Sequence, residues 1–290
     1  MESSTGIVLE GGAMRSIFSA GVLDFLMDKG IEIPNMIAVS AGAYVGLNYI
    51  SGQRGRCMDA MIEPLAEYKY MGMSTFFKKG TFFDMEYLFN EVPKVKSPFD
   101  FVTFKQFPGK FLTSTVDCKS GEAVYHEHFK DQDELFKILT AANSMPFIAK
   151  ISQIGGRPML DGGMADAIPI AKALEEGWNK IIVVLTRDIT YRKKEKNRLY
   201  QLAIDIVYHR YPKFVKLIRG RGKYYNNSLD AIAQLEKEGR AFVLRPTTMT
   251  VGNKESDVET LKAYYRHGYD TAKERFGELL QFLGLDSTVE

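Results

Sequence analysis

The chain has 290 residues, of which 45% are hydrophobic and 26% are charged, and its formal net charge is +2. This composition is typical of a globular protein with a sizeable core, and the length predicts one large domain or two small ones. The longest aliphatic run, residues 181–185, is far short of the roughly 20 apolar residues of a spanning helix, so none is predicted. Two isolated cysteines and an N-terminus without a secretory signal predict no disulfide framework and a cytoplasmic location.

The first fifty residues alternate between two kinds of apolar pattern. Residues 6–9 form a short apolar run that ends at a Gly-rich turn, which predicts a buried strand. Apolar residues at three- and four-residue spacing predict a helix over residues 18–26. A second apolar run, residues 36–39, precedes a helical pattern over residues 43–50. This strand, helix, strand, helix order predicts a mostly parallel sheet covered by helices.

Later elements extend the same plan. Further strands are expected at residues 111–116, 123–126, 181–185 and 241–244, and helices at residues 134–142, 199–211, 229–238 and 258–282. We therefore expect an α/β fold with three layers, α/β/α, around a central, mostly parallel sheet. The preferred division is a core domain over residues 6–186 and a mainly helical C-terminal region over residues 187–290 packed on it.

Ser40 stands in the segment Ala-Val-Ser-Ala-Gly, residues 38–42, where a strand turns into a helix. Acyl transfer by serine requires a hydroxyl presented on a sharp turn, and small residues two before and two after the serine permit such a turn. The N-terminal amides of the following helix would lie beside the nucleophile. A serine that merely caps the helix is the competing interpretation.

Residues 10–15, Glu-Gly-Gly-Ala-Met-Arg, form a second strand-to-helix turn. The segment has neither the Gly-Lys-Ser/Thr ending of a Walker loop nor the G-x-G-x-x-G pattern of a dinucleotide site. An oxyanion hole needs only two or three preorganised backbone amides, and this interpretation fits best. A simple tight turn is the alternative.

Asp161-Gly162-Gly163 is the third motif, and by itself an Asp-Gly-Gly segment is most often only a turn. The three motifs together, with the Met-Pro-Phe segment at residues 145–147, resemble the patatin-like phospholipase family, bacterial type. The resemblance extends from about residue 6 to about residue 186 and is much weaker beyond.

The resemblance implies a patatin-like fold and a Ser-Asp dyad without histidine, with Ser40 as nucleophile and Asp161 as base. It also implies hydrolysis of acyl esters of lipids, with phospholipid or lysophospholipid as the substrate class and no cofactor. Arg15 matches the basic position that orients the Gly-rich loop. The implied oxyanion hole consists of the backbone amides of Gly11, Gly12 and Ala13. Ala13 departs from the usual third glycine, so a positive φ there would strain the hole.

Two alternatives compete with this assignment. A Ser-Asp-His triad would recruit His209 or His267, although each is more typical of a surface or helix-face residue. A non-catalytic lipid-binding protein on the same scaffold is supported only by the altered Gly-rich loop. His126 and His128 by themselves make a poor metal site, so no metal is predicted. Asp166 matches no position of the family motif and receives no role.

Two segments have a local bias. Residues 68–107 contain twelve aromatic residues, which indicates either a lid or acyl-chain pocket, or ordinary core packing, and we favour core packing. Residues 187–223 contain twelve Lys or Arg and three acidic residues. Within this segment, apolar residues at helical spacing form a stripe that consists of Leu199, Leu202, Ala203, Ile206 and Val207. The stripe suits either peripheral contact with anionic lipid or packing on the sheet, and packing is favoured. No nucleic-acid-binding module accompanies the charge, so nucleic acid is not expected, and the oligomeric state stays open.

Overall fold

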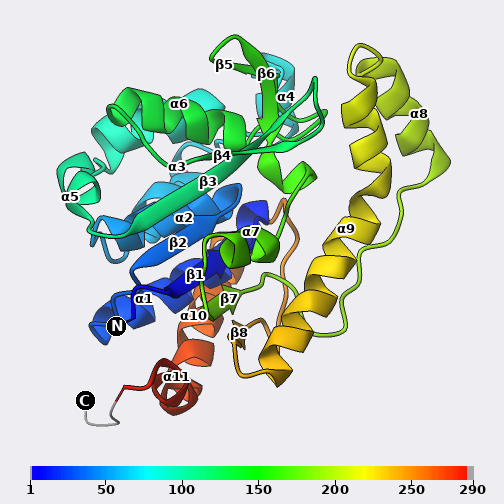
Figure 1. Cartoon of the computed structure of the whole chain (residues 1–290). Coiled ribbons are helices and arrows are strands. Elements are labelled where there is room, and N and C mark those ends of the chain that lie inside the picture. Colours follow the sequence, from blue (N-terminus) through cyan, green and yellow to red (C-terminus); the bar gives the residue numbers. More distant parts are fainter. Residues whose placement is uncertain (1, 286–290) are drawn as a thin grey trace.

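The predicted apolar strands lie side by side in one mixed sheet (Figure 1). In the computed structural model, which describes residues 2–285, this sheet has eight strands in the order β5-β6-β3-β2-β1-β7-β8, with β4 also paired to β3. The strands are β1 (Thr5–Leu9), β2 (Asn35–Ala38), β3 (Lys110–Asp117), β4 (Ala123–His126), β5 (Ser152–Ile154), β6 (Arg157–Asp161), β7 (Lys180–Val184) and β8 (Ala241–Leu244). The pairs that join β3, β2, β1, β7 and β8 are parallel, and β4, β5 and β6 pair in antiparallel fashion. The prediction of a mostly parallel sheet is confirmed.

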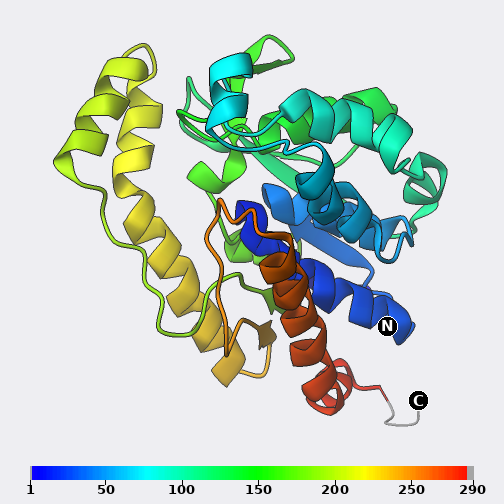
Figure 2. The same ribbon diagram turned by 180° about the vertical axis from the view of Figure 1, so that it is seen from behind.

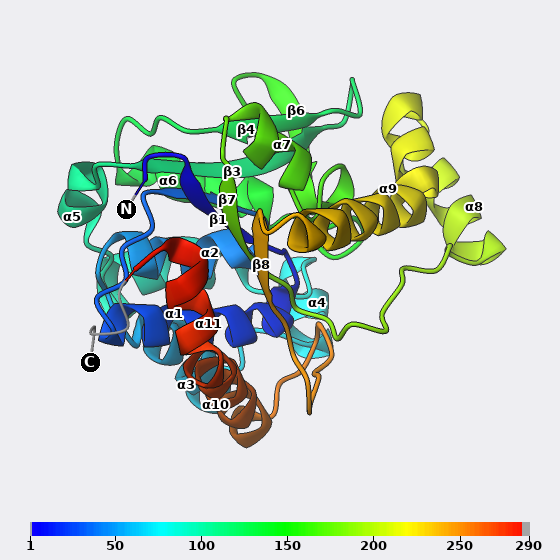
Figure 3. The same ribbon diagram turned by 60° about the horizontal axis from the view of Figure 1, so that its bottom comes forward.

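Helices cover both faces of the sheet, as Figures 2 and 3 show from two further sides. One layer contains α1 (Ile17–Asp28), α2 (Ala41–Ile50), α6 (Gln132–Ala142), α10 (Val258–Glu274) and α11 (Phe276–Leu283). The other layer contains α7 (Ile170–Glu175) and most of α9 (Pro212–Lys237). The three-layer α/β/α fold expected from the sequence is therefore present.

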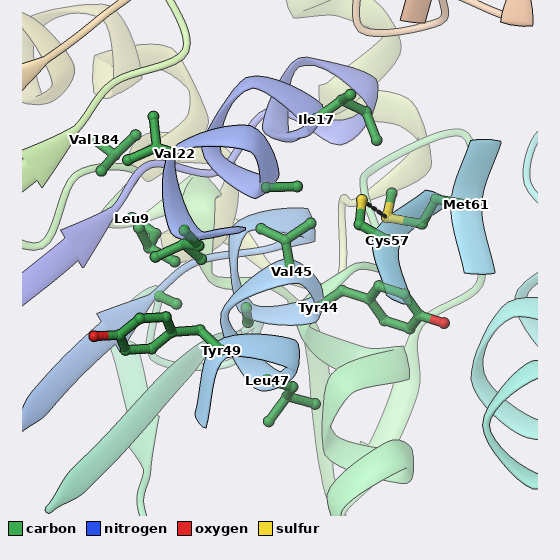
Figure 4. Packing of buried hydrophobic residues seen from close by; sticks show 14 of the residues in the cluster. Leu9, Ile17, Val22, Tyr44, Val45, Leu47, Tyr49, Cys57, Met61 and Val184 are labelled. Atoms are coloured by element: carbon green, nitrogen blue, oxygen red, sulfur yellow. Dashed lines mark hydrogen bonds between the residues drawn. The ribbon is translucent and has the colours of Figure 1, made fainter. Parts of the chain in front are cut away.

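Alternate residues of the central strands enter two different cores. Ile182 and Val184 of β7 pack with α1 and α2, whereas Ile181 and Val183 pack with α7 and α9. Figure 4 shows Val184 in the first of these cores with Leu9 of β1 and Val22 of α1. Because both faces are covered, these strands are continuous apolar runs without polar alternation.

Helices α1 and α10 cross at unusually short range. A Cβ at Gly21 would lie 2.0 Å from the carbonyl oxygen of Tyr265, and one at Gly268 would lie 2.0 Å from that of Phe18. Only glycine allows this backbone-to-backbone contact. The C-terminal region is thereby packed directly on the first helix of the chain. The boundary at residue 186 itself stays a prediction.

Several elements differ from the sequence-based expectation. The helix expected over residues 199–211 ends earlier, as α8 (Arg198–Val207), and Pro212 begins a new 26-residue helix, α9, whose last part is the helix expected at 229–238. The helix expected over residues 258–282 divides into α10 and α11 at Arg275. The segment between α2 and β3 forms short helices that the sequence did not predict: η2 (Met58–Ile62), α3 (Glu63–Glu67), α4 (Met73–Lys79), η3 (Tyr87–Lys96) and α5 (Phe101–Gln106). Two 3-10 turns, η1 (Ala13–Ser16) and η4 (Gly162–Met164), follow β1 and β6.

The favoured packing of the apolar stripe on the sheet is wrong. Only Ile204 of α8 is fully buried, with Tyr200 partly buried, in a cluster that also contains residues of α9 and of the sheet strands β3 and β6. Neither residue belongs to the predicted stripe. Most of the stripe faces outward, namely Leu199, Leu202, Ile206 and Val207. Within residues 2–285, no helix has the length and apolarity needed to span a membrane.

Candidate active site

Ser40 lies on a sharp turn between β2 and α2, as the sequence predicts. Its backbone has φ 54° and ψ −133°, a conformation that a residue with a Cβ adopts only under strain. The side chain is 6% exposed and does not cap the helix. The geometry thus matches a presented hydroxyl rather than the alternative of an ordinary helix cap.

Asp161 ends β6 and contacts Ser40 directly, although the two residues are 121 positions apart. The Ser40 hydroxyl donates to Oδ2 of Asp161 at 2.6 Å, and the N–H of Gly163 donates to Oδ1 at 2.7 Å. The pairing of β6 with β3, and of β3 with β2, brings the two strand ends together. A Cβ at Gly162 would lie 2.4 Å from the carbonyl oxygen of Ser114, so the turn after Asp161 requires a glycine.

The environment of Asp161 strengthens it as a base. Burial raises the pKa of this carboxyl above its ordinary value, because the side chain is only 2% exposed. The hydrogen bonds from Ser40 and Gly163 oppose this rise in pKa, as do the charges of Arg221 and Lys193. A carboxylate with a raised pKa accepts a proton from a hydroxyl more readily than a free aspartate does.

The Gly-rich loop lies against the same serine. Gly11, Gly12 and Ala13 line a small cavity of about 40 Å³ together with Ser40 and Asp161. The N–H of Gly11 already donates to the carbonyl oxygen of Ala167 at 3.4 Å. Within residues 2–285, the N–H groups of Gly12 and Ala13 have no hydrogen-bond partner. Two of the three predicted amides are therefore free to receive an oxyanion.

Ala13 has a φ of 49°, in the left-handed region that favours glycine. A positive φ at this residue is the condition under which the sequence predicted a strained loop, and the structure has that positive φ. Ala13 still lines the cavity that contains Ser40, and its N–H has no hydrogen-bond partner within residues 2–285. A left-handed alanine costs about 1–2 kcal/mol relative to its favoured conformations.

Arg15, which was predicted to orient the Gly-rich loop, lines the same cavity as that loop. Its Nε is buried and has no hydrogen-bond partner among the described residues. Burial, followed by the charge of Arg187, lowers the pKa of Arg15. The neighbouring acid is Glu10, which is 2% exposed and accepts hydrogen bonds from Thr186 and from the Tyr225 hydroxyl. The orienting role of Arg15 stays a prediction.

Two cations of the C-terminal region were not predicted at the site. Arg221 of α9 donates from Nε to the carbonyl oxygen of Gly163 at 2.9 Å and lines the cavity beside Arg15. Burial and the charge of Arg221 lower the pKa of Lys193 to about 7. Both residues lie in the basic segment 187–223, and no sequence motif distinguishes them from their exposed neighbours.

An apolar cavity of about 50 Å³ adjoins the polar one, and the two share Ala13, Ser40 and Met145. The aromatic-rich segment contributes five of its lining residues, which are Tyr70, Phe83, Met85, Leu88 and Phe89. Most of them are also buried in the core. The segment therefore serves both in core packing, as favoured, and in a pocket beside the serine.

The histidines of the alternative triad lie elsewhere. His209 is exposed, and its Nδ1 contacts the carbonyl oxygen of Ile206. His267 interacts with the backbone of the loop at residues 247–248. Neither ring contacts Ser40 or Asp161. Across residues 2–285, no cluster of three or more His, Cys, Asp or Glu side chains could hold a metal ion. Asp166 accepts a hydrogen bond from the Tyr125 hydroxyl at 2.7 Å.

Comparison with known proteins gives matches for both parts of the chain. A family model described as patatin-like phospholipase matches residues 7–174, and a domain of unknown function (DUF6363) matches residues 211–284. The uncharacterized protein YjjU of Escherichia coli (strain K12) is 25% identical over 184 residues, which cover 62% of this chain and 51% of YjjU. The chain thus matches about half the length of this curated relative. The crystal structure of VipD from Legionella pneumophila aligns with a TM-score of 0.47 and 12% identity over 94% of this chain and 67% of VipD.

Proposed function

Because the chain belongs to the patatin-like phospholipase family, we propose that it hydrolyses acyl esters of lipids, with Ser40 as nucleophile and Asp161 as general base. The observation that carries the proposal is the 2.6 Å hydrogen bond from the Ser40 hydroxyl to a buried carboxylate. Nucleophile and base at this distance are the geometric requirement for covalent catalysis by serine.

The proposed reaction has two halves. The Ser40 oxygen attacks the ester carbonyl carbon while Oδ2 of Asp161 takes the hydroxyl proton. The amides of Gly12 and Ala13 bind the tetrahedral oxyanion, and the alcohol leaves with the proton from Asp161. Water then attacks the acyl-serine as Asp161 takes one of its protons. The bond between the acyl carbon and the Ser40 oxygen breaks, Asp161 returns the proton to that oxygen, and the fatty acid is released. No cofactor takes part in these steps.

The two adjoining cavities support a lipid substrate. The apolar cavity lies on one side of Ser40, where an acyl chain would be desolvated by aromatic and aliphatic side chains. The polar cavity on the other side contains Arg15 and Arg221, where the glycerophosphate part of a phospholipid or lysophospholipid would lie. The ester bond would then sit between them, at the serine.

A fluorophosphonate probe tests the assignment directly. We expect covalent labelling at Ser40 by mass spectrometry, no labelling of Ser40→Ala and strongly reduced labelling of Asp161→Asn. The rate of hydrolysis of a short-chain p-nitrophenyl ester should be highest for the parent protein, strongly reduced for Asp161→Asn and absent for Ser40→Ala. Unchanged hydrolysis in both variants would reject the dyad. Loss of activity in His209→Ala or His267→Ala, with Asp161 dispensable, would favour the triad.

A non-catalytic lipid-binding protein is the competing function. The positive φ of Ala13 is the observation in its favour, because a strained oxyanion loop could have lost its catalytic use. This alternative predicts retained binding of a fluorescent lipid with neither labelling of Ser40 nor hydrolysis in the unmodified chain. The same labelling experiment therefore distinguishes the two functions.

A further inference from the structure

The outer face of α8 is apolar and uncovered. Leu199 is 78% exposed, Leu202 57%, Ile206 64% and Val207 55%. Leu199, Leu202 and Ile206 recur at three- and four-residue spacing, so they lie on one side of the helix. The opposite side is anchored by Ile204, which is fully buried among residues of α9 and β3. The exposed face is thus held in place by the fold, with its large side chains in solvent.

Exposed basic residues lie in α8 and in the segments that adjoin it in sequence, with one exposed acid, Glu195, among them. The exposed members of the group are Lys194, Lys196, Arg198, Arg210, Lys213 and Lys216. Within residues 2–285, none of them forms an ion pair; Asp205 of α8 is paired with Arg219, which lies outside the group. The surface therefore combines uncovered apolar side chains with a net positive charge.

Helix α4 adds a second exposed apolar group at the same end of the molecule. Figures 1 and 2 both place α4 and α8 at this end, above the edge of the sheet. Met73 is 57% exposed and Phe77 is 79% exposed. The residues that flank α4 in sequence include Tyr70 and Phe83, which line the apolar cavity beside Ser40. A lipid surface at this end would be close to the proposed acyl-chain pocket.

We propose that α8, assisted by α4, docks the protein onto an anionic lipid surface. Apolar side chains of an interfacial helix insert at the boundary between headgroups and acyl chains, and basic residues around them bind anionic headgroups. The charge of the surrounding residues selects this occupant over a neutral membrane or an uncharged protein surface. The docking surface lies outside the catalytic residues, so its function does not depend on the proposed dyad.

Vesicle binding provides the test. The Ser40→Ala protein, which cannot consume the lipid through the proposed dyad, is mixed with vesicles of phosphatidylcholine alone or with added phosphatidylserine and analysed by flotation. We expect binding to the anionic vesicles that weakens as salt is raised, because exposed charges are screened. Neutralising one basic residue, as in Arg198→Gln, should weaken binding about fivefold.

The apolar contribution is tested by the double change Leu202→Asp and Ile206→Asp, which should weaken binding to anionic vesicles roughly tenfold or more. Val102→Asp is the matched control, because Val102 is 66% exposed on α5, far from α8 in Figure 1. This control should bind within about twofold of the parent protein. Hydrolysis of a soluble short-chain ester by the double variant, made with Ser40 intact, should be unchanged and shows that the fold is retained.

Three results would overturn the proposal. The first is no binding of the parent protein to anionic vesicles, and the second is equal loss in the double variant and the Val102 control. The third is that the double variant converts a dimer to a monomer while vesicle binding is retained, which would assign the face to a second copy of the chain. Absence of esterase activity with vesicle binding intact would reject the proposed function alone.

Discussion

The backbone of Ser40 carries strain that a glycine would remove. Its φ of 54° and ψ of −133° are costly for any residue with a Cβ, by about 1–3 kcal/mol. Ser40→Ala and Ser40→Gly both remove the hydrogen bond to Asp161, so comparison of the two variants isolates the backbone. A glycine also increases the conformational entropy of the unfolded chain, which lowers the free energy of unfolding by about 0.4–1 kcal/mol and offsets part of the relieved strain. We therefore expect Ser40→Gly to be more stable than Ser40→Ala by about 1–2 kcal/mol.

Urea denaturation at neutral pH, followed by circular dichroism, measures this difference. The two variants should have the same dependence of unfolding free energy on urea, and the midpoint of the glycine variant should be higher. Both should be inactive and unlabelled by a fluorophosphonate. Equal midpoints, or a lower midpoint for glycine, would show that the turn is not strained and would refute the reasoning.

Three further predictions concern the site. Because burial raises the pKa of Asp161, kcat/KM should fall as pH drops through a midpoint above 3.8, and the folded state should favour the protonated carboxyl. Protonated Asp161 therefore stabilises the fold fully at acidic pH, and this stabilisation is lost as pH rises. The stability of Asp161→Asn relative to the parent should thus be greater at neutral pH than at acidic pH. Thermal unfolding of both proteins at the two pH values checks this sign, and a relative gain found only at acidic pH would contradict it. Ala13→Gly should stabilise the protein by about 1 kcal/mol, measured by urea denaturation, since it relieves the positive φ, and a loss of stability would argue against that strain. Leu88→Trp should reduce kcat/KM for long-chain esters more than for an acetate ester, because Leu88 lines the apolar cavity; equal effects on both would remove this cavity as the acyl-chain pocket.

The central strands were predictable because their signals are local, whereas the contact between Ser40 and Asp161 was expected only from the family resemblance. Residues 6–9 and 181–185 are apolar runs bounded by turns, and both are strands covered on two faces. The β5–β6 hairpin was missed because β5 is short and half-exposed, so it lacks an apolar pattern. The helix break before Pro212 was missed because the apolar spacing continues through Tyr208, which is buried against α9.

The contribution of the C-terminal region to the site could not be read from sequence. Arg221 reaches the carbonyl oxygen of Gly163 across 58 positions, and its position depends on how α9 packs on the sheet. No local pattern separates it from Arg219, which instead pairs with Asp205 on the surface. The exposure of α8 was misjudged for the same reason: an amphipathic pattern shows that a helix has an apolar side but not what covers it.

The crossing of α1 and α10 sets a limit on how this chain can be shortened. Gly21 of α1 lies against the carbonyl oxygen of Tyr265, Gly268 of α10 lies against that of Phe18, and β8 shields the outer edge of β7. A chain ended at residue 186 would leave β7 with an open hydrogen-bonding edge and aliphatic side chains on both faces, which is a template for aggregation. It would also leave the groove around Gly21 empty. Engineering of smaller variants should therefore remove surface loops and retain the last helices, since these close the sheet that positions the turns at Ser40 and Asp161.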